Sequence, residues 1–316
     1  MISAIAITGP TASGKTALSI ALARRLGCEI ICCDSMQIYR RMDIGTAKVT
    51  KEEQSLVPHY MFDICDPTEN YSAEDYREAA IERAREISER GMIPMFVGGT
   101  GLYIDTVMRG APLQSPPSDR ELHASLIKDA ESEEGKELLW QRLNSVDPAS
   151  AEKIHKNNVR RVARALEIYL LSGRTKTDFD LDSQCNDPDV SVQMLTLDFR
   201  DRELLYKRVD RRVDLMMEQG LLSEVEALFC DGMLDPSFTA SAAIGYKELV
   251  DYLEGRCSLQ SAVETIKLSS RRYAKRQLTW FRHERDALRL FVDREDGSMK
   301  SEDELICEAM LLLGRA

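Results

Sequence analysis

The sequence predicts an α/β fold, with a parallel sheet flanked by helices and a mainly helical insertion. Short apolar stretches alternate with helical patterns through the first third of the chain, which is the order of βαβ units. A glycine-rich turn follows the first apolar stretch, and a proline-rich break and a long helical pattern come later. We therefore expect an α/β core with C-terminal helices at residues 1–111 and 191–316, and the helical insertion at residues 112–190.

Three apolar stretches predict the first strands of the sheet. They occupy residues 2–8, 29–33 and 92–97. Helical patterns connect them, from about Lys15 to Leu26 and from Ser72 to about Arg90. Polar segments follow the carboxyl ends of the strands, which is where parallel sheets bind their ligands. We therefore assign Thr8–Thr16, Asp34 and Gly98–Thr100 to one site.

The rest of the chain is predicted to be mainly helical. Residues 111–118 form the proline-rich break, and a helical pattern runs from about Asp119 to Ser172. Residues 173–190 are polar and turn-rich, which predicts a mobile loop. Residues 191–199 alternate like a strand that returns to the sheet, and residues 289–293 predict the last strand.

The composition is that of an ordinary soluble protein. Of its 316 residues, 43% are hydrophobic and 30% are charged, which is enough to bury a core. No apolar run is long enough to span a bilayer and the N-terminus lacks a basic leader, so we expect no membrane segment and no signal peptide. The eight cysteines form neither a CxxC pair nor a zinc-type Cys/His cluster, so we expect reduced thiols and a cytoplasmic protein.

The net charge of −11 argues against a nucleic-acid partner, because phosphate contacts require Lys and Arg. Three basic stretches oppose this overall charge, at residues 153–164, 200–212 and 267–285. The third interleaves Tyr273, Trp280 and Phe281, and bases among aromatic rings suit a single-stranded RNA loop. The alternative is an amphipathic helix with the rings in the core, which we expect for the rings but not for the basic side chains.

Residues 9–16 match the phosphate-binding pattern G-x-x-x-x-G-K-[ST]. Its glycines let backbone N–H groups surround phosphate oxygens, its lysine adds a positive charge, and the Thr16 hydroxyl can hold Mg²⁺. The predicted diphosphate-binding residues are Gly9, Pro10, Thr11, Ala12, Ser13, Gly14, Lys15 and Thr16. The pattern leaves open a small-molecule kinase, a nucleotide-driven motor or switch, and a transferase with a diphosphate leaving group.

Further motifs narrow this choice. In chain order the segments are GPTASGKT (9–16), DSMQIY (34–39), DIGTAK (43–48), GGTGLY (98–103), RRVARALE (160–167), IGYKE (244–248) and YAKRQLTWFR (273–282). With them the chain resembles the tRNA dimethylallyltransferases, also called tRNA isopentenyltransferases, from Gly9 to about Arg282. The phosphate loop is widespread, whereas DSMQIY, GGTGLY and KRQLTWFR together are specific. Val49 replaces a common proline and Ala242 a common glutamine, and neither touches the expected chemistry.

The resemblance implies a P-loop kinase-like core with a helical insertion that grips the anticodon stem-loop of tRNA. It implies transfer of a dimethylallyl group from dimethylallyl diphosphate to N6 of adenine 37, giving N6-dimethylallyladenosine, with Mg²⁺ as cofactor. The adenine must leave the base stack to reach a buried group. The zinc finger of eukaryotic members is absent from the sequence, which indicates the bacterial type, and we expect a monomer.

The expected chemistry assigns roles to three residues. An exocyclic amine is a weak nucleophile, so a base helps by taking its proton, and resemblance and position assign Asp34 to that role. The alternative is that Asp34 holds a metal-bound water or caps the next turn. Thr100 is expected to orient the bridging oxygen or the amine, which is compatible with a helix N-cap. Arg212, with Arg208 one turn away, is expected to stabilise the leaving diphosphate together with Lys15, although a solvated charge run is the alternative.

The resemblance and the basic stretches together predict the tRNA contacts. They are Asp34, Ser35, Met36, Gln37, His123, Arg160, Arg161, Arg164, Gly245, Tyr246, Lys247, Lys275, Arg276, Gln277 and Arg282. His123 falls near a position where members often carry an RNA-contacting arginine, and a surface histidine is an equal alternative.

Three other functions fit part of the sequence. A nucleoside-monophosphate or shikimate type of kinase explains the phosphate loop and the sheet, but not the basic helices or the GGTGLY turn. A nucleotide-gated RNA-binding module without chemistry is a second alternative, but such a module would gain nothing from the Asp34 carboxylate beside RNA. An enzyme that prenylates free adenine nucleotides does not explain the long basic C-terminal half.

Overall fold

The computed structural model describes residues 1–108, 116–185 and 189–315. The chain forms two compact units, one of residues 1–108 with 189–316 and the other of residues 109–188. The predicted proline-rich break and the predicted boundary at 111/112 lie partly or wholly outside the described residues.

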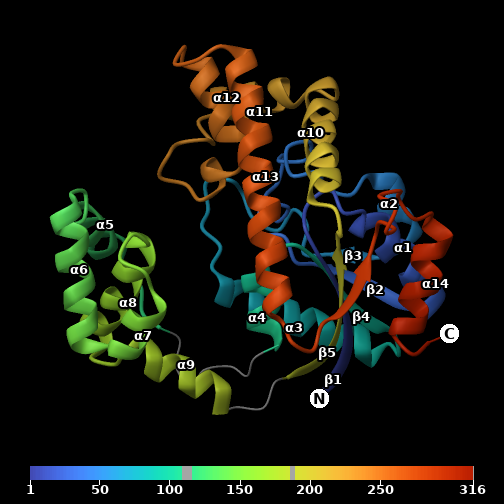
Figure 1. The fold of residues 1–316 in the computed structure, drawn as a ribbon, viewed down its shortest axis with the longest axis horizontal. Helices are drawn as coiled ribbons and strands as arrows, with labels where there is room; N and C mark the ends of the chain where they lie inside the picture. Colours follow the sequence, from blue (N-terminus) through green and yellow to red (C-terminus); the bar gives the residue numbers. More distant parts are fainter. Residues whose placement is uncertain (109–115, 186–188, 316) are drawn as a thin grey trace. The chain divides into compact units, whose positions relative to one another are not determined.

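Within the described residues, the larger unit holds a six-stranded sheet in the order β3-β2-β4-β1-β5-β6 (Figure 1). The strands are β1 (Ile2–Thr8), β2 (Cys28–Cys32), β3 (His59–Tyr60), β4 (Ile93–Gly98), β5 (Val190–Asp198) and β6 (Leu288–Phe291). Every pairing is parallel, which confirms the predicted fold class and the strands expected from the apolar stretches. The two-residue β3 was missed because it is too short to leave a periodic pattern.

Helices cover both faces of this sheet (Figure 1). The helices described in the larger unit are α1 (Lys15–Leu26), α2 (Lys51–Leu56), α3 (Ala73–Glu89), α4 (Gly101–Met108), α10 (Arg202–Glu218), α11 (Leu221–Cys230), α12 (Tyr246–Leu253), α13 (Leu259–His283) and α14 (Glu302–Leu312), with a 3₁₀ turn at Ala240–Ala242; α11 and α12 lie away from the sheet. Alternate β1 side chains enter opposite layers: Ile5 and Ile7 pack in the layer of α1 and α14, and Ala4 and Ala6 in that of α3 and α4. The helices predicted at 15–26 and 72–90 are thereby confirmed.

A third apolar cluster lies among α10, α11, α12 and α13. The segment after β2 contributes Ile38 and Met42, and the helices contribute Val213, Leu221 and Tyr246. This cluster ties the chain that follows β2 to helices more than 150 residues later in the sequence. It thereby fixes the backbone that leads away from Asp34.

The smaller unit is helical. It contains α5 (Arg120–Lys128), α6 (Glu133–Val146), α7 (Pro148–Lys153), α8 (Val159–Ser172) and α9 (Lys176–Cys185), packed around Leu126, Leu143, Val162 and Leu166. The helical block predicted at 119–172 is confirmed.

The mobile loop predicted at residues 173–190 is wrong over residues 176–185, which form α9; residues 186–188 lie outside the described part. The missed signal is a capping pair, since Asp178 N donates to Thr175 Oγ1 at 3.1 Å and Thr175 N donates to Asp178 Oδ2 at 2.8 Å. Phe179 is buried and anchors the helix. In the described residues we find no helix with the length and apolarity needed to cross a bilayer.

Candidate active site

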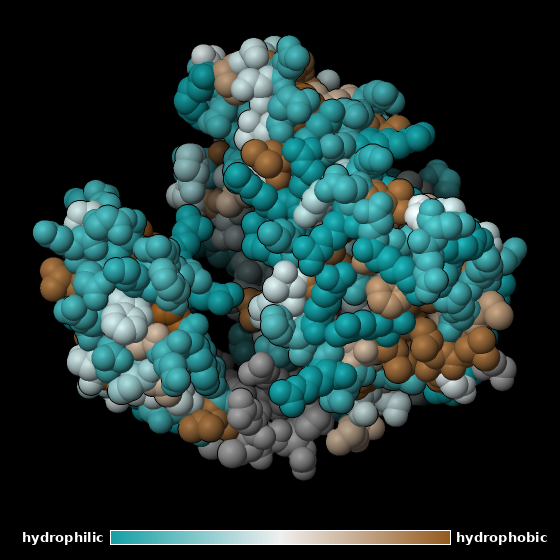
Figure 2. All heavy atoms as spheres, viewed as in Figure 1, coloured by the Kyte–Doolittle hydropathy of each residue, from teal (hydrophilic) through white to brown (hydrophobic). Residues whose placement is uncertain are grey.

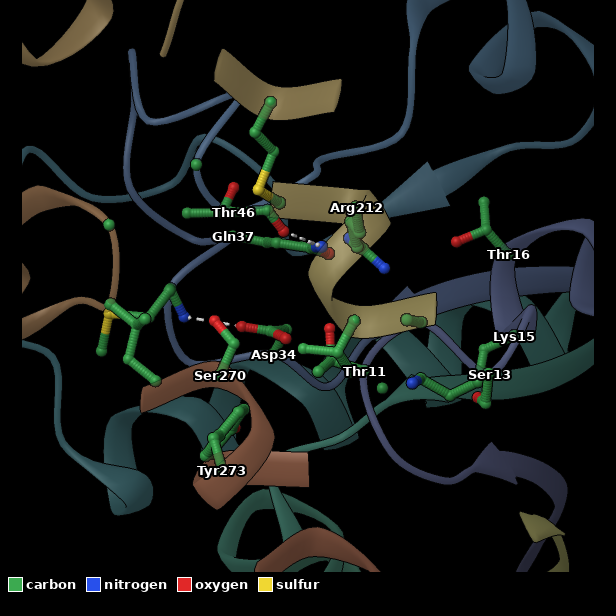
Figure 3. A pocket seen from close by; sticks show the side chains of 18 of the residues that line it. Thr11, Ser13, Lys15, Thr16, Asp34, Gln37, Thr46, Arg212, Ser270 and Tyr273 are labelled. Carbon is green, nitrogen blue, oxygen red and sulfur yellow. Dashed lines mark hydrogen bonds between the residues drawn. The ribbon is translucent and has the colours of Figure 1, made fainter. Parts of the chain in front are cut away.

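Three adjacent strands deliver the predicted site residues to one edge of the sheet. β2, β4 and β1 are neighbours, and their carboxyl ends lead to Asp34, to Gly99–Thr100 and to the phosphate loop at residues 9–16. A cavity of about 710 Å³ opens there, and its lining includes Lys15, Asp34 and Arg212 (Figure 3). Helices α10 and α13 complete its wall.

The phosphate loop has the backbone shape that its glycines permit. Gly9 has φ +139°, and a Cβ atom there would lie 2.8 Å from Leu197 O. Gly14 has φ +95° and precedes α1 without a side-chain cap, so the first N–H groups of α1 are left for a ligand. The buried Ser13 hydroxyl finds no hydrogen-bond partner among the described residues. A phosphate oxygen would satisfy these donors.

Two partly buried cations lie beside the phosphate loop. Lys15 Nζ donates to Gly9 O at 3.0 Å and to Pro10 O at 2.7 Å. Burial and, next, the charge of Arg212 lower the pKa of Lys15 to about 7, although Asp34 opposes the shift. Burial also lowers the pKa of Arg212. Figure 3 shows the Arg212 guanidinium directed into the space beside Lys15 and Thr16. An anion placed there would favour the charged form of both groups.

Helix α10 presents one side of its basic stretch to the phosphate loop. Arg208 Nε donates to Ala12 O at 2.9 Å, and Ala12 holds a left-handed φ of +61°. Arg208 and Arg212 are half-buried, whereas Arg211 is exposed. A fully solvated charge run is therefore excluded for Arg208 and Arg212, and Arg208 supports the shape of the phosphate loop.

Asp34 lies across the cavity from Lys15 (Figure 3). Its Oδ1 accepts from Met36 N at 2.9 Å, so the turn-capping role does exist, and it occupies one of the two carboxylate oxygens. Thr100 lies next to it, because Thr100 N donates to Cys33 O at 3.1 Å and Thr100 Oγ1 accepts from Ser35 N at 3.0 Å. This arrangement leaves a carboxylate oxygen beside a hydroxyl at the end of β2.

Tyr273 of α13 joins this group. Burial and the nearby Asp34 carboxylate raise the pKa of the Tyr273 phenol, while a hydrogen bond with Thr100 opposes the shift. Of the aromatic residues expected in the core, Phe281 is buried as predicted, whereas Tyr273 lines the cavity. Tyr273 therefore belongs to the site and not to the core.

Gln277, one helical turn after Tyr273, connects the two glycine-rich turns. Its Oε1 accepts from Thr11 N at 2.8 Å, and its Nε2 donates to Gly99 O at 2.9 Å. A Cβ atom at position 99 would lie only 2.1 Å from that Nε2, so the glycine makes room for the bridge. The side chain is 5% exposed and both ends of its amide are engaged inside the protein, but it also lines the cavity, so its predicted tRNA contact stays a prediction.

Other predicted tRNA contacts also have interior roles. Gly245 and Tyr246 are buried, and the Tyr246 hydroxyl donates to Glu224 at 2.6 Å. Arg282 pairs with the buried carboxylate of Asp198, with NH2 2.6 Å from Oδ1. The three predicted contacts stay predictions, but the Tyr246 and Arg282 side chains also bind partners inside the protein, and Gly245 lines the cavity. Sequence reasoning missed this because buried and exposed positions alternate within the same motifs.

The remaining predicted contacts are accessible. Ser35, Met36, Gln37 and Arg276 line the cavity. Lys247 and Lys275 are exposed. The face of the larger unit shown in Figure 2 is mainly hydrophilic over α10 and α13. These side chains stay predicted tRNA contacts.

In the smaller unit the predicted contacts divide into two groups. Arg160 and Arg161 are exposed on α8. Arg164 and His123 instead converge on Glu167, which is 1% exposed; Arg164 NH1 and His123 Nδ1 each lie 3.0 Å from its Oε2. Arg164 and His123 are therefore oriented by a buried carboxylate.

The donor set of the cavity fits Mg²⁺ bound together with a diphosphate. Among the described residues, no three His, Cys, Asp or Glu side chains are grouped as for a metal ion held by protein alone. The Thr16 hydroxyl at the start of α1 and the Asp34 carboxylate both line the cavity. Mg²⁺ prefers such oxygen donors, and it commonly takes one or two from the protein and the rest from phosphate and water.

Comparison with known proteins gives a consistent result. A family model described as IPP transferase matches residues 37–284. A tRNA dimethylallyltransferase of Bacillus anthracis is 52% identical over 298 residues, which cover 94% of this chain and 92% of that protein. A crystal structure of a full-length tRNA isopentenylpyrophosphate transferase from Bacillus halodurans is similar with a TM-score of 0.72 and 41% identity, over 99% of this chain and 96% of the other.

A eukaryotic relative is also similar in fold. The structure of a eukaryotic dimethylallyltransferase acting on tRNA matches with a TM-score of 0.76 and 29% identity. The match covers all of this chain and 81% of the eukaryotic one.

Proposed function

The chain belongs to the IPP transferase family, and on that premise we propose that it transfers a dimethylallyl group from dimethylallyl diphosphate to N6 of adenine 37 in tRNA. The product would be N6-dimethylallyladenosine. The observation that carries the proposal is one cavity with a phosphate loop and partly buried cations on one side and a carboxylate on the other. A kinase site would also have the phosphate loop and its cations. The family is what indicates tRNA as the second substrate.

The phosphate loop is the proposed seat of the diphosphate. Its backbone N–H groups and the Ser13 hydroxyl offer hydrogen bonds, and Lys15 and Arg212 offer charge. As the bond between the allylic carbon and the bridging oxygen breaks, its electron pair leaves with the diphosphate. Lys15 and Arg212 stabilise that developing charge, and they do so strongly because they are removed from water.

Asp34 is the proposed base. N6 of the adenine attacks the allylic carbon, and the proton that N6 loses passes to the Asp34 carboxylate. Met36 N fixes one oxygen of that carboxylate, which sets its orientation. Thr100 and Tyr273 lie beside it and orient the amine or the bridging oxygen. We call Asp34–Gln37, Thr100 and Tyr273 the acceptor end of the cavity.

Mg²⁺ is the proposed cofactor. Thr16 would hold it together with oxygens of the diphosphate, and Asp34 lies close enough in the same cavity to share that task through water. When bound, the ion would neutralise charge on the diphosphate. The ion and Lys15 would therefore act on the same leaving group.

The proposed acceptor is the anticodon stem-loop of tRNA, with adenine 37 turned out of the stack into the cavity. Exposed Lys275 and Arg276 on α13, and Arg160 and Arg161 on α8, are the proposed phosphate contacts. The smaller helical unit would grip the stem-loop. We further propose a monomer of the bacterial type that acts in the cytoplasm on its tRNA.

One assay tests the proposal. Purified protein is incubated with unmodified tRNA, dimethylallyl diphosphate and Mg²⁺, and the tRNA nucleosides are then analysed by mass. The expected result is a dimethylallyl addition on adenosine, absent from tRNA in which position 37 is not adenine. Transfer of the γ-phosphate of ATP to a small molecule, without allyl addition to tRNA, would support the kinase alternative instead.

A further inference from the structure

A carboxylate behind the acceptor end holds the backbone turn at residues 43–45. Glu224 Oε2 accepts from Asp43 N at 2.9 Å and from Ile44 N at 2.8 Å, and its Oε1 accepts from Gly45 N at 3.1 Å. Hydrogen bonds to an ionised acceptor are stronger than neutral ones. Three consecutive N–H groups on one side chain therefore fix this turn to α11.

Tyr246 completes the arrangement from α12. Its hydroxyl donates to Glu224 Oε1 at 2.6 Å, and the side chain is fully buried. Burial, and next the Glu224 carboxylate, raise the pKa of Tyr246, so its hydroxyl stays protonated and remains a donor. A Cβ atom at Gly45 would lie 2.5 Å from the Tyr246 ring. The ring therefore packs directly on the turn that Glu224 binds.

The turn carries backbone strain on both sides. Arg41 and Ala47 have φ of +66° and +49°, a left-handed region that costs energy for residues other than glycine. Such conformations persist where surrounding contacts fix them. Arg41 NH2 lies 2.6 Å from Asp231 Oδ2, just after the end of α11, so α11 and the residue that follows it hold the segment at two points.

The residues that follow the 43–45 turn bind the side chain of Gln37 in the cavity. Gln37 Nε2 donates to Thr46 O at 2.9 Å and to Ala47 O at 3.2 Å, and Gln37, Gly45 and Thr46 all line the cavity (Figure 3). The position of the Gln37 amide therefore follows the position of this segment. Glu224 binds the backbone of residues 43–45. Among the contacts of the described residues, none joins Glu224 to the phosphate loop.

We propose that Glu224 is a positioning residue for the acceptor base: by fixing the 43–45 turn it sets the Gln37 carboxamide beside Asp34. The inference rests on the proposed function, because it takes the Asp34–Gln37 end of the cavity as the place of the adenine. Loss of Glu224 then impairs use of tRNA and leaves the donor site at the phosphate loop unchanged.

Glu224→Gln tests this, with Glu226→Gln as the matched control. Both residues lie on α11 and both substitutions remove one negative charge, but Glu226 is exposed. In Glu224→Gln one oxygen becomes an amide group that faces backbone donors. We expect kcat/KM for tRNA to fall about 10- to 100-fold, while the dissociation constant for dimethylallyl diphosphate changes less than about twofold. Glu226→Gln should match the unmodified protein in both.

The same substitution in a Gln37→Ala background separates positioning from general support of the fold. If Glu224 acts through Gln37, Glu224→Gln should cost less than about threefold further once Gln37 is gone. A full multiplicative loss in the double variant would overturn the inference. So would an equal loss of donor affinity in Glu224→Gln.

Tyr246→Phe is a second variant that tests the same inference if Glu224→Gln does not fold. It removes one donor to Glu224 and keeps the ring on Gly45, and we expect a loss of about 3- to 10-fold in kcat/KM for tRNA with donor affinity intact. No loss in Tyr246→Phe, or a loss confined to donor affinity, contradicts the inference. The unmodified protein distinguishes the two proposals: if it transfers no allyl group, the proposed function fails, and if it does while Glu224→Gln is as active, only this inference fails.

Discussion

At the phosphate loop, one continuous segment supplies the backbone of the site, whereas the acceptor end is assembled from strands and helices far apart in the chain. The loop runs from Gly9 to Thr16. At the acceptor end, Thr100 bonds to Ser35 across 65 positions, and α13 contributes Tyr273. The first region depends on local geometry and buried charge, and the second depends on how α13 packs against the sheet. Substitutions in the two regions should therefore fail in different steps of the reaction.

The largest effect is expected at the acceptor end. Asp34→Asn removes the base but keeps the shape and the acceptor for Met36 N. A positioned base contributes about 10²- to 10⁴-fold in rate, so the single-turnover rate at saturating substrates should fall within that range. Affinities for tRNA and dimethylallyl diphosphate, measured by titration, should change by much less. A normal single-turnover rate in Asp34→Asn would contradict the assignment of Asp34 as the base.

A smaller loss of a different kind is expected at the phosphate loop. Lys15→Ala removes a charged donor that serves the diphosphate before and during the reaction, so both donor affinity and rate should fall. We expect the dissociation constant for dimethylallyl diphosphate to rise about 10- to 100-fold. Calorimetric titration with the donor measures it. Unchanged donor affinity would mean that the diphosphate lies elsewhere.

Gln277 joins the two regions, so its variant should affect both moderately. Gln277→Met keeps the volume but loses the bonds to Thr11 N and Gly99 O. We expect kcat/KM for tRNA to fall about 5- to 30-fold and donor affinity to weaken in parallel. The exposed neighbour Lys275→Met is the control, and it should weaken tRNA binding only. A Gln277 variant that impairs tRNA binding alone would favour a direct contact of Gln277 with tRNA over the bridging role.

The smallest effect concerns protons at the phosphate loop. The pKa of Lys15 is lowered to about 7 by burial and by Arg212, so the amine loses its proton as pH rises through 7. Bound diphosphate favours the charged amine, so the complex keeps that proton and affinity should fall about fivefold between pH 7 and pH 8. Calorimetry in buffers of different ionisation enthalpy should show uptake approaching one proton at pH 8. Lys15→Arg should show no such uptake.

The sequence was informative where chemistry is local. The apolar stretch at residues 2–8, the phosphate pattern and the helical pattern after it predicted β1, the turn and α1, because a strand, a glycine turn and a helix start lie within one short stretch. Strand ends also placed Asp34 and Thr100 at one edge of the sheet. Helix α9 was missed because its capping pair, Thr175 and Asp178, lies in a polar stretch that also suits a loop.

Interior roles of charged and amide side chains were not predictable in the same way. Gln277, Tyr246 and Arg282 lie in motifs that also carry exposed basic residues, and only the structure reveals the partners that they bind inside the protein. Glu224 left no signal at all, since an acidic residue on an amphipathic helix is ordinarily solvated. Each of these bonds joins residues at least 22 positions apart, so a pattern read within a short window of sequence could not detect it.

The most direct test of the division between the two regions is a Mg²⁺ titration of Asp34→Asn under single-turnover conditions. If Asp34 takes the proton from the adenine amine, the rate should stay low at every Mg²⁺ concentration, with donor affinity close to that of the unmodified protein. If Asp34 instead serves the metal ion at the phosphate loop, excess Mg²⁺ should restore much of the rate and the defect should appear first in donor binding. Such a rescue would contradict the assignment of proton transfer to the acceptor end.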